Sequence, residues 1–349
     1  MSERVYLDYN ATTPLRAEAR SAMIAAMDVL GNPSSVHSEG RAAKALVERA
    51  RAQVAAALGA DGADVIFTSS ATEAAALACA GRGLSAAPVE HEAVAAWTDS
   101  TLAVSPSGAI EIVDPAHSAV QLANSETGVM QALPDGVAAC DMTQAFGKVR
   151  VSFNQSGAKM ALVSAHKLGG PKGVGALVVR RGTDVAAQIK GGGQEMGRRS
   201  GTENIIGIAG FGAAAEAAGH DLAGGTWDRV EKLRNILEKA IAAAGNKTIF
   251  VGKDSARLPN TSCILTPGWK GETQVMAMDL AGFAISAGSA CSSGKVRASA
   301  VLRAMGHSEA DAASAIRVSL GPQTTEDEII RFAQVWLRHL DKHRARVSA

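Results

Sequence analysis

The 349-residue sequence has few aromatic residues, few cysteines and no excess of charge of either sign. Aromatic side chains make up only 4% of the chain, so small aliphatic residues have to fill the core. Lys and Arg number 35 and Asp and Glu 34, which leaves a net charge of +1 and no basic excess of the kind that nucleic acids or acidic membranes bind. Because 47% of the residues are hydrophobic, we expect a globular and not a disordered chain.

Long apolar runs are lacking too. The longest, residues 205–215, stops at Glu216, whereas a membrane-spanning helix needs about 20 apolar residues. Residues 1–5 lack the apolar run of a secretion signal. The cysteines form no C-x-x-C pair and have no zinc-ligand spacing; they are Cys79, Cys140, Cys263 and Cys291. We therefore expect a cytoplasmic protein with free thiols, three of them in the core.

Short apolar runs alternate with alanine-rich stretches of helical spacing, which is typical of an α/β fold with a largely parallel sheet. The expected strands are residues 65–68, 119–123, 137–140 and 176–179. The expected helices are residues 41–58, 71–80, 203–218, 227–244 and 325–340. The length favours about two domains. The Gly-rich segment 221–225 indicates the approach to a boundary, after which the pattern suits a smaller α+β domain.

His166 and Lys167 follow the apolar run 160–163, and open α/β sheets place their chemistry at strand ends. A free lysine is a poor nucleophile, because only about 0.04% of it is unprotonated at pH 7. An imine with an aldehyde cofactor avoids that cost. The glycines that follow are not a P-loop, which needs Ser or Thr after its lysine, because Gly173 follows Lys172. A surface lysine beside a hydrogen-bonded histidine is the other interpretation.

Three further positions suit a phosphorylated aromatic ligand. Residues 67–74 run from a strand into a helix through small hydroxyl residues, which is typical of a phosphate site or of an ordinary N-cap. Asp141 ends an apolar strand, where its carboxylate needs a partner such as a protonated pyridine nitrogen or a helix N-terminus. His91 lies at a strand-to-helix junction, where it could stack on a ring or face solvent.

Two positions suit the substrate. Cys291 lies among Gly and Ser in residues 287–294, so we expect it on a loop, where a nucleophilic thiol needs a neighbour that lowers its pKa. Arg317 lies in an apolar strand and needs an anion there, either a substrate carboxylate or a structural salt bridge. Taken together, these residues match the needs of one cofactor, pyridoxal 5′-phosphate, and of one amino-acid substrate.

The residues described above, and the order in which they occur, resemble those of the group I cysteine desulfurases of the nitrogenase and iron–sulfur type, within the class V aminotransferases. The resemblance extends from Tyr6 to about Glu328. The matching segments are residues 6–14, 31–35, 67–73, 90–91, 126–128, 141–144, 166–167, 170–173, 191–193, 199–202, 288–292 and 317–321.

The resemblance implies the type I fold of pyridoxal-phosphate-dependent transferases. In that fold a mainly parallel seven-stranded sheet lies in a three-layer αβα large domain, here residues 15–245, beside a smaller α+β domain, here residues 1–14 and 246–349. It also implies a homodimer with shared active sites. The reaction would convert L-cysteine to L-alanine and pass sulfur, as a persulfide, to an acceptor or scaffold protein for iron–sulfur cluster assembly or other sulfur transfer. No metal, nucleic acid or membrane would take part.

The resemblance also implies a role for each matching residue. Lys167 would bind the cofactor aldehyde and Cys291 would take the sulfur. Asp141 would face the pyridine nitrogen, Gln144 the ring hydroxyl and His91 the ring face. The phosphate would be held by Ala71, Thr72, Ser164, His166 and, from the neighbouring subunit, Thr202, and the substrate by Arg317, Asn10 and Ser125.

The sequence departs from the family pattern at a few positions. Ser125 stands where the family has a second Asn, Gln194 where His is common, and Ala165 where Gly is frequent. Residues 83–90 and 97–114 are short compared with the family. The alternative functions are a related lyase, such as a selenocysteine lyase, an aminotransferase-like enzyme, and a non-catalytic paralogue that scaffolds a partner.

Overall fold

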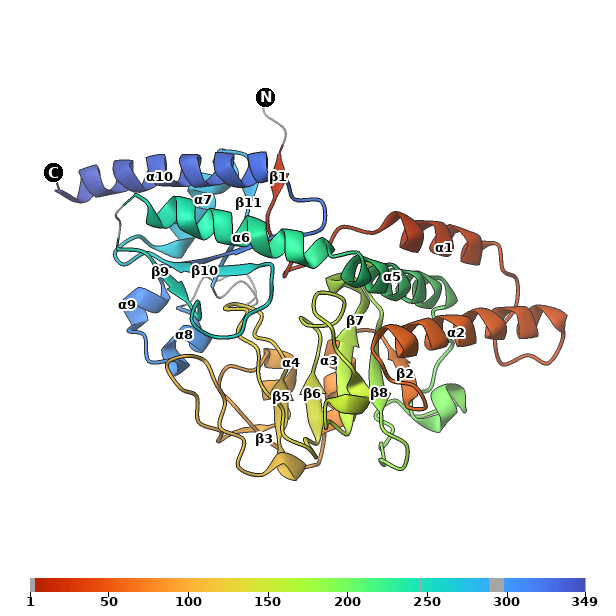
Figure 1. Cartoon of the computed structure of the whole chain (residues 1–349). Coiled ribbons are helices and arrows are strands. Elements are labelled where there is room, and N and C mark those ends of the chain that lie inside the picture. Colours follow the sequence, from red (N-terminus) through yellow and green to blue (C-terminus); the bar gives the residue numbers. More distant parts are fainter. Residues whose placement is uncertain (1–3, 245–246, 289–297, 349) are drawn as a thin grey trace.

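The computed structural model describes residues 4–244, 247–288 and 298–348, and these form two main sheets with helices packed around them (Figure 1). The helices are α1 (Ala17–Met27), α2 (Ser38–Ala57), α3 (Ala71–Cys79), α4 (Glu92–Ala95), α5 (Ile205–Ala223), α6 (Thr226–Ala242), α7 (Gly271–Leu280), α8 (Ala300–Ala304), α9 (Glu309–Ala312) and α10 (Glu326–Ser348). The strands are β1 (Val5–Tyr6), β2 (Asp64–Thr68), β3 (Ser85–Ala86), β4 (Asp99–Ser100), β5 (Ala119–Gln121), β6 (Ala139–Asp141), β7 (Met160–Ser164), β8 (Gly175–Val179), β9 (Ile249–Val251), β10 (Thr261–Leu265), β11 (Phe283–Ala284), β12 (Ser286–Ala287) and β13 (Ala315–Ser319). Cys291 lies outside the described residues.

The larger sheet has five strands in the order β2-β8-β7-β6-β5. β5, β6 and β7 are parallel, and β8 runs against both of its neighbours. β3 and β4 form a separate parallel pair, which a single bridge from Ser85 to Ser118 links to the chain just before β5. The predicted type I fold and its mainly parallel strands are confirmed. Of the seven strands that the fold predicts for this sheet, the described residues form five in one ladder, and the two-residue strands β3 and β4 lie as a pair beside it.

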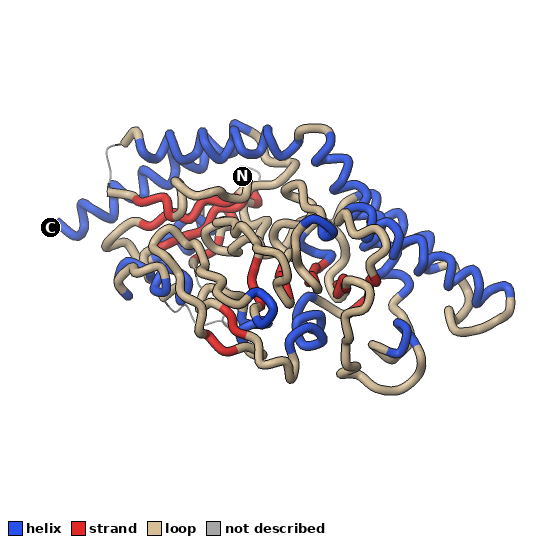
Figure 2. The backbone as a smooth tube through the Cα atoms, turned by 60° about the horizontal axis from the view of Figure 1, so that its bottom comes forward, coloured by secondary structure: helices blue, strands red, loops and turns tan. Residues whose placement is uncertain are grey.

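Side chains alternate along the strands between two layers of helices. On β2, Val65 and Phe67 pack into the same core as α2 and α5, whereas Ile66 packs with α3. The strands β7 and β8 alternate in the same way. A sheet that is buried on both faces has helices on both sides, so the predicted three-layer αβα arrangement is confirmed. Figure 2 shows long helices along one side of the molecule.

The second sheet is antiparallel, in the order β12-β13-β10-β9. One face packs with α6, α7 and α10 around Trp336, whose indole N–H donates to Gln274 Oε1 at 3.0 Å. The other face packs with α8. None of the helices in the described part of the chain has the length and apolar character to cross a membrane.

The predicted helices and strands are confirmed, with ends that differ by a few residues; α10 is the exception and continues beyond its predicted end to Ser348. The domain boundaries stay a prediction. Helix α6 packs in the core of the second sheet through residues such as Trp227 and Leu237, and this packing favours a boundary close to the Gly-rich segment 221–225.

Gly321 packs directly against the ring of Tyr9. An ideal Cβ at Gly321 would lie 1.9 Å from Cε1 of Tyr9, which is buried and has no room to move away. We expect Gly321→Ala to lower the free energy of unfolding by about 2 kcal/mol. In the matched control, Gly219→Ala in α5, the new methyl group meets no described atom within 4 Å apart from the neighbouring helix backbone, and the variant should gain about 0.5–1 kcal/mol. Urea unfolding measures both, and a neutral Gly321→Ala would contradict the close packing.

Candidate functional site

A cavity of about 340 Å³ lies at the carboxyl ends of three parallel strands. Gln121, Asp141 and Ser164, the last residues of β5, β6 and β7, all line it. The predicted site residues that line it with Asp141 and Ser164 are Asn10, Ala71, Thr72, His91, Ser125, Gln144, His166, Lys167 and Arg317. The fold therefore places these predicted residues together at strand ends, including residues more than 300 positions apart, while their roles stay a prediction.

Lys167 ends a single 3-10 turn, Ala165–Lys167, that directly follows β7. Its Nζ donates hydrogen bonds to the carbonyl oxygens of Asn10 at 2.8 Å and Ala11 at 2.9 Å. Asn10 and Ala11 line the cavity as well. The amine is therefore held at the cavity wall and does not extend to the protein surface.

The first turn of α3 forms another part of the wall. The Ser70 hydroxyl accepts from the Glu73 N–H, but the described residues offer no acceptor to the N–H groups of Ala71 and Thr72, which both line the cavity. Gly175 on β8 lets this turn approach closely, because a Cβ there would lie 2.9 Å from the Ala71 nitrogen. Unpaired N–H groups at a helix start, with the helix dipole behind them, favour an anion.

His166 lies beside this turn in an environment that keeps it uncharged. Burial, together with the charges of three lysines, lowers its pKa to about 4; these lysines are Lys167, Lys172 and Lys148. Its Nδ1 lies 3.2 Å from Thr12 Oγ1. The neutral ring and the cationic surroundings both suit an anionic ligand.

His91 and Asp141 are each oriented by the local backbone. His91 is the N-cap of α4, where Nδ1 accepts from the Ala93 N–H at 3.1 Å. Asp141 Oδ1 accepts from the Thr143 N–H at 2.9 Å. This contact caps a turn, since no helix of the described chain starts directly after Asp141, and the residue also lines the cavity.

Arg317 is buried on β13, with 3% of its surface exposed. Its Nη2 donates to Asp8 Oδ1 at 2.8 Å and its Nη1 to the Ser125 carbonyl at 3.1 Å, so the structural salt bridge considered for it exists. Its Nε is buried and has no hydrogen-bond partner in the described part of the chain. Because Arg317 also lines the cavity, it keeps a donor with which it could bind an anion.

Comparisons with known proteins support what the geometry indicates. The family model "Aminotransferase class-V" matches residues 5–100 and 113–332. The chain belongs to the class-V aminotransferases. It is 39% identical to a cysteine desulfurase of Cereibacter sphaeroides, over 98% of this chain and 97% of that protein, and 39% identical to one of Klebsiella pneumoniae, over 94% and 90%. Within the class-V aminotransferases it therefore belongs with the cysteine desulfurases.

Solved structures agree with that assignment. A NifS-like protein from Rickettsia africae superposes with a TM-score of 0.87 at 30% identity, covering 97% of this chain and all of that one. The protein SspA, solved in complex with cysteine, superposes with a TM-score of 0.76 at 27% identity and covers 92% of this chain. The family model skips residues 101–112, which overlap the segment that the sequence showed to be short.

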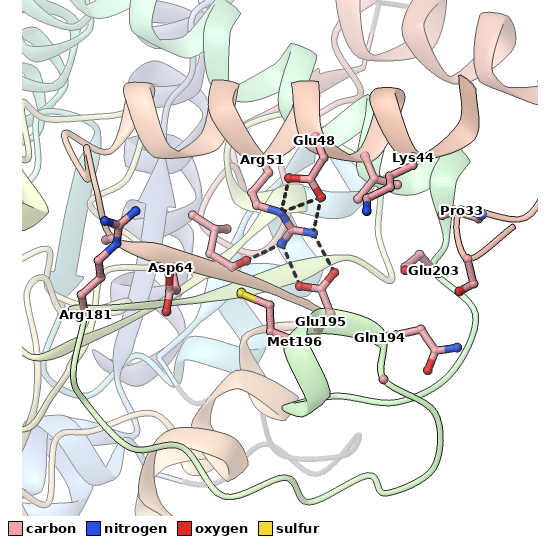
Figure 3. Close-up of a pocket in the computed structure, with 15 residues that line it drawn as sticks. Pro33, Lys44, Glu48, Arg51, Asp64, Arg181, Gln194, Glu195, Met196 and Glu203 are labelled. Carbon is pink, nitrogen blue, oxygen red and sulfur yellow. Dashed lines mark hydrogen bonds and ion pairs between the residues drawn. The ribbon is translucent and has the colours of Figure 1, made fainter. Parts of the chain in front are cut away.

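A larger cavity, of about 890 Å³, is less suited to the chemistry of a class-V aminotransferase. Figure 3 shows Arg51 in its wall between Glu48 and Glu195. The guanidinium donates to both Glu195 oxygens, at 2.7 and 3.1 Å, and Glu195 also accepts from the Phe67 N–H at 3.0 Å. The Arg51 guanidinium is thus already paired with carboxylates of the chain, and none of the predicted catalytic or binding residues lines this cavity.

One predicted site residue of the described chain, Thr202, does not line the cavity at the strand ends. Thr202 lines a separate cavity of about 120 Å³, together with Thr68 and Arg199. Its predicted contact with a neighbouring subunit stays a prediction. Cys291 lies outside the described residues.

Two charged residues of the site, Lys148 and Asp8, were not predicted. Lys148 contacts Asn10 and Gln144, and Asp8 pairs with Arg317. Asp8 lies in the family-like segment 6–14, which was the only available signal for it. Lys148 follows Gly147 in a stretch without any motif, so nothing in the sequence marked it.

Glu126, next to Ser125, carries an unusual carboxyl group. Burial raises its pKa to about 7, although a hydrogen bond from the Ser299 hydroxyl and the charge of Arg317 both act to lower it. Since the unfolded value is about 4.3, the folded chain holds an extra proton between the two values, and stability falls as pH rises through that range.

We expect Glu126→Gln to remove this part of the pH dependence. The stability of the variant relative to wild type should therefore increase from about pH 5 to about pH 8, by about 2 kcal/mol. Urea unfolding at both pH values measures the difference. Glu111→Gln, which changes the same charge at an exposed position, should show no such trend. A parallel pH profile of Glu126→Gln and wild type would contradict the raised pKa.

Proposed function

We propose that this protein is a pyridoxal-phosphate-dependent cysteine desulfurase, which converts L-cysteine to L-alanine and takes the sulfur on Cys291. The observation that carries the proposal is the position of the Lys167 amine, in one cavity with the first turn of α3, Asp141 and Arg317. The names of the relatives, and the cysteine bound to one structural neighbour, support the same substrate.

The residues of the cavity fit the cofactor. The N–H groups of Ala71 and Thr72 have no acceptor in the described chain, and a close approach at Gly175 shapes the turn that carries them, so a phosphate has donors there. Ser164 and His166 lie beside the same cavity and would complete the phosphate site. Asp141 provides a carboxylate for a protonated ring nitrogen.

The remaining roles follow from the same cavity. When bound, the cofactor supplies an aldehyde for an amine and a ring that accepts the electrons left when Cα loses its proton. Lys167 would bind the aldehyde, Gln144 would contact the ring hydroxyl and His91 would stack on the ring. Asn10 and Ser125 were predicted to bind substrate. Asn10 uses its side-chain amide for Thr261 Oγ1, at 2.8 Å, and for the Ser125 carbonyl, at 3.2 Å, so we propose that it shapes the cavity wall instead.

Side chains of this protein would transfer the protons of the reaction and bind the charged groups of the substrate. The Lys167 amine would take the Cα proton of the substrate, while the Arg317 guanidinium holds the substrate carboxylate. The Cys291 thiolate would then attack the substrate sulfur and form the S–S bond of a persulfide while the C–S bond of the substrate breaks, its electron pair staying on the carbon fragment that becomes alanine. His91 would take the proton of the substrate thiol. Each of these groups other than Cys291 lies on the described cavity.

We also propose the setting implied by the resemblance. The enzyme would be a homodimer in which Thr202 reaches the phosphate site of the neighbouring subunit, and it would pass its sulfur to an acceptor or scaffold protein, including for iron–sulfur cluster assembly. A cytoplasmic location remains a prediction.

Incubation with L-cysteine should add one sulfur to Cys291. The three other cysteines are fully buried, and burial raises their pKa, to about 12 for Cys79, so none competes at pH 8. Mass spectrometry should find the added sulfur in wild type and in the control Cys79→Ala but not in Cys291→Ala. The Cys291→Ala variant should still bind cofactor, and its alanine production should fall by more than about 100-fold. Normal sulfide release by Cys291→Ala would disprove the role of the thiol.

Arg317→Lys should weaken the binding of L-cysteine. Lysine keeps the charge but loses the planar, bidentate donors, so KM should rise by about 10-fold or more while kcat changes less. The exposed Arg303→Lys serves as the control. An unchanged KM would assign Arg317 to its salt bridge with Asp8 alone. Assays with selenocysteine and alanine as substrates separate the desulfurase from a selenocysteine lyase and from an aminotransferase.

A further inference from the structure

Lys148 is a buried lysine that the proposed chemistry leaves without a role. Only 1% of its surface is exposed, which places it among the largest fully buried side chains of the described chain. It does not line the strand-end cavity but lies behind two residues that do, Asn10 and Gln144.

The Lys148 amine closes a ring of hydrogen bonds. Its Nζ donates to Asn10 Oδ1 at 3.0 Å and to Gln144 Oε1 at 2.7 Å. Gln144 Nε2 in turn donates to the carbonyl oxygen of Asn10 at 3.0 Å, and the same carbonyl accepts from Lys167 Nζ at 2.8 Å. Lys148 is therefore connected to the reactive amine through Gln144 and Asn10.

The position is electrostatically costly. No carboxylate pairs with Lys148 in the described residues, and its two acceptors are neutral amide oxygens. Burial, followed by the charges of Lys167 and Arg317, lowers its pKa well below the usual value. Those two cations are the charged groups that face it. An apolar residue would avoid this cost, so the amine calls for an explanation beyond stability.

The donor also determines the orientation of Gln144. Because an amine hydrogen requires an acceptor, the atom of Gln144 next to Lys148 has to be the oxygen, and Nε2 has to point to the Asn10 carbonyl. Without Lys148, the Gln144 amide could rotate and offer its oxygen to the cavity instead of its N–H group.

We propose that Lys148 is a positioning residue of this site, which fixes the Gln144 amide and the Asn10 carbonyl and, through them, the environment of the Lys167 amine. This inference rests on the proposed function only in requiring that Lys167 bind an aldehyde cofactor. It predicts that Lys148 affects the proton affinity of the Lys167 nitrogen without touching cofactor or substrate.

The test is a pH titration of the visible absorbance of the cofactor bound to Lys167. In Lys148→Met, the Asn10 carbonyl that accepts from Lys167 Nζ is no longer held in place, so the protonated Lys167 nitrogen is stabilised less and the midpoint should shift downward by about one pH unit. Loss of the Lys148 charge alone would shift the midpoint upward and would overturn the positioning role. The exposed Lys159→Met, which makes the same exchange just before β7, should titrate like wild type. If Lys148 acts through Gln144, its effect should largely disappear in a Gln144→Met background.

The outcomes separate the inference from the proposed function. A folded Lys148→Met that titrates like wild type, or a shift that persists undiminished with Gln144→Met, overturns the positioning role. If Lys148→Met does not fold, Lys148→Gln, which keeps an N–H donor in the interior, decides: a midpoint close to that of wild type supports the positioning role, and an upward shift, as expected from loss of the charge alone, overturns it. The titration needs no turnover. A wild type that binds cofactor but forms no alanine refutes the desulfurase and leaves this test intact, whereas a wild type that binds no cofactor refutes both.

Discussion

Asn10 is the point at which the two sheets and the candidate site are joined. Its backbone N–H donates to Ser319 Oγ at the end of β13, and its side-chain amide donates to Thr261 Oγ1 on β10. Its carbonyl oxygen accepts from Lys167, after β7 of the other sheet, and from Gln144. Asn10 is 1% exposed, and a buried polar group has to be paired, so these bonds allow one orientation of the N-terminal segment. The position of the reactive amine relative to the second sheet depends on that orientation.

Much of the fold could be predicted because the periodicity of apolar residues reports burial. The alternation along β2 separates Val65 and Phe67 from Ile66, and this is what produces the three layers. The continuity of the sheet could not be predicted in the same way. Whether Ser85 belongs to a ladder or to a single bridge depends on how closely two backbones approach, which no local pattern records. The domain boundary could not be predicted for a similar reason, because the apolar periodicity of α6 would be the same whichever of the two sheets it packed on.

In the candidate site, too, some residues could be predicted from the sequence and others could not. Lys167, Asp141 and the start of α3 could be predicted because each follows a strand, and strand ends meet at one edge of a parallel sheet. The partners of these residues could not. Lys148 contacts Asn10 across 138 positions and Asp8 contacts Arg317 across 309, so their roles exist only in three dimensions. The sequence alone does not distinguish a lysine that is buried and hydrogen-bonded from a lysine that is exposed to solvent.

The buried charges around the cavity explain why an anionic ligand would stabilise this part of the fold. Arg317 has one carboxylate partner and an unpaired Nε, and Lys148 has no carboxylate partner in the described residues. Glu90 lies nearby, but burial, together with the charge of Asp141, raises its pKa well above the usual value and so disfavours a carboxylate there. An anion that enters the cavity offers a partner to Arg317 and accepts from the N–H groups of α3 that have no acceptor in the described residues. Binding of an anion therefore offsets part of the free-energy cost of burying these charged groups. The stability of this region consequently depends on whether its site is occupied.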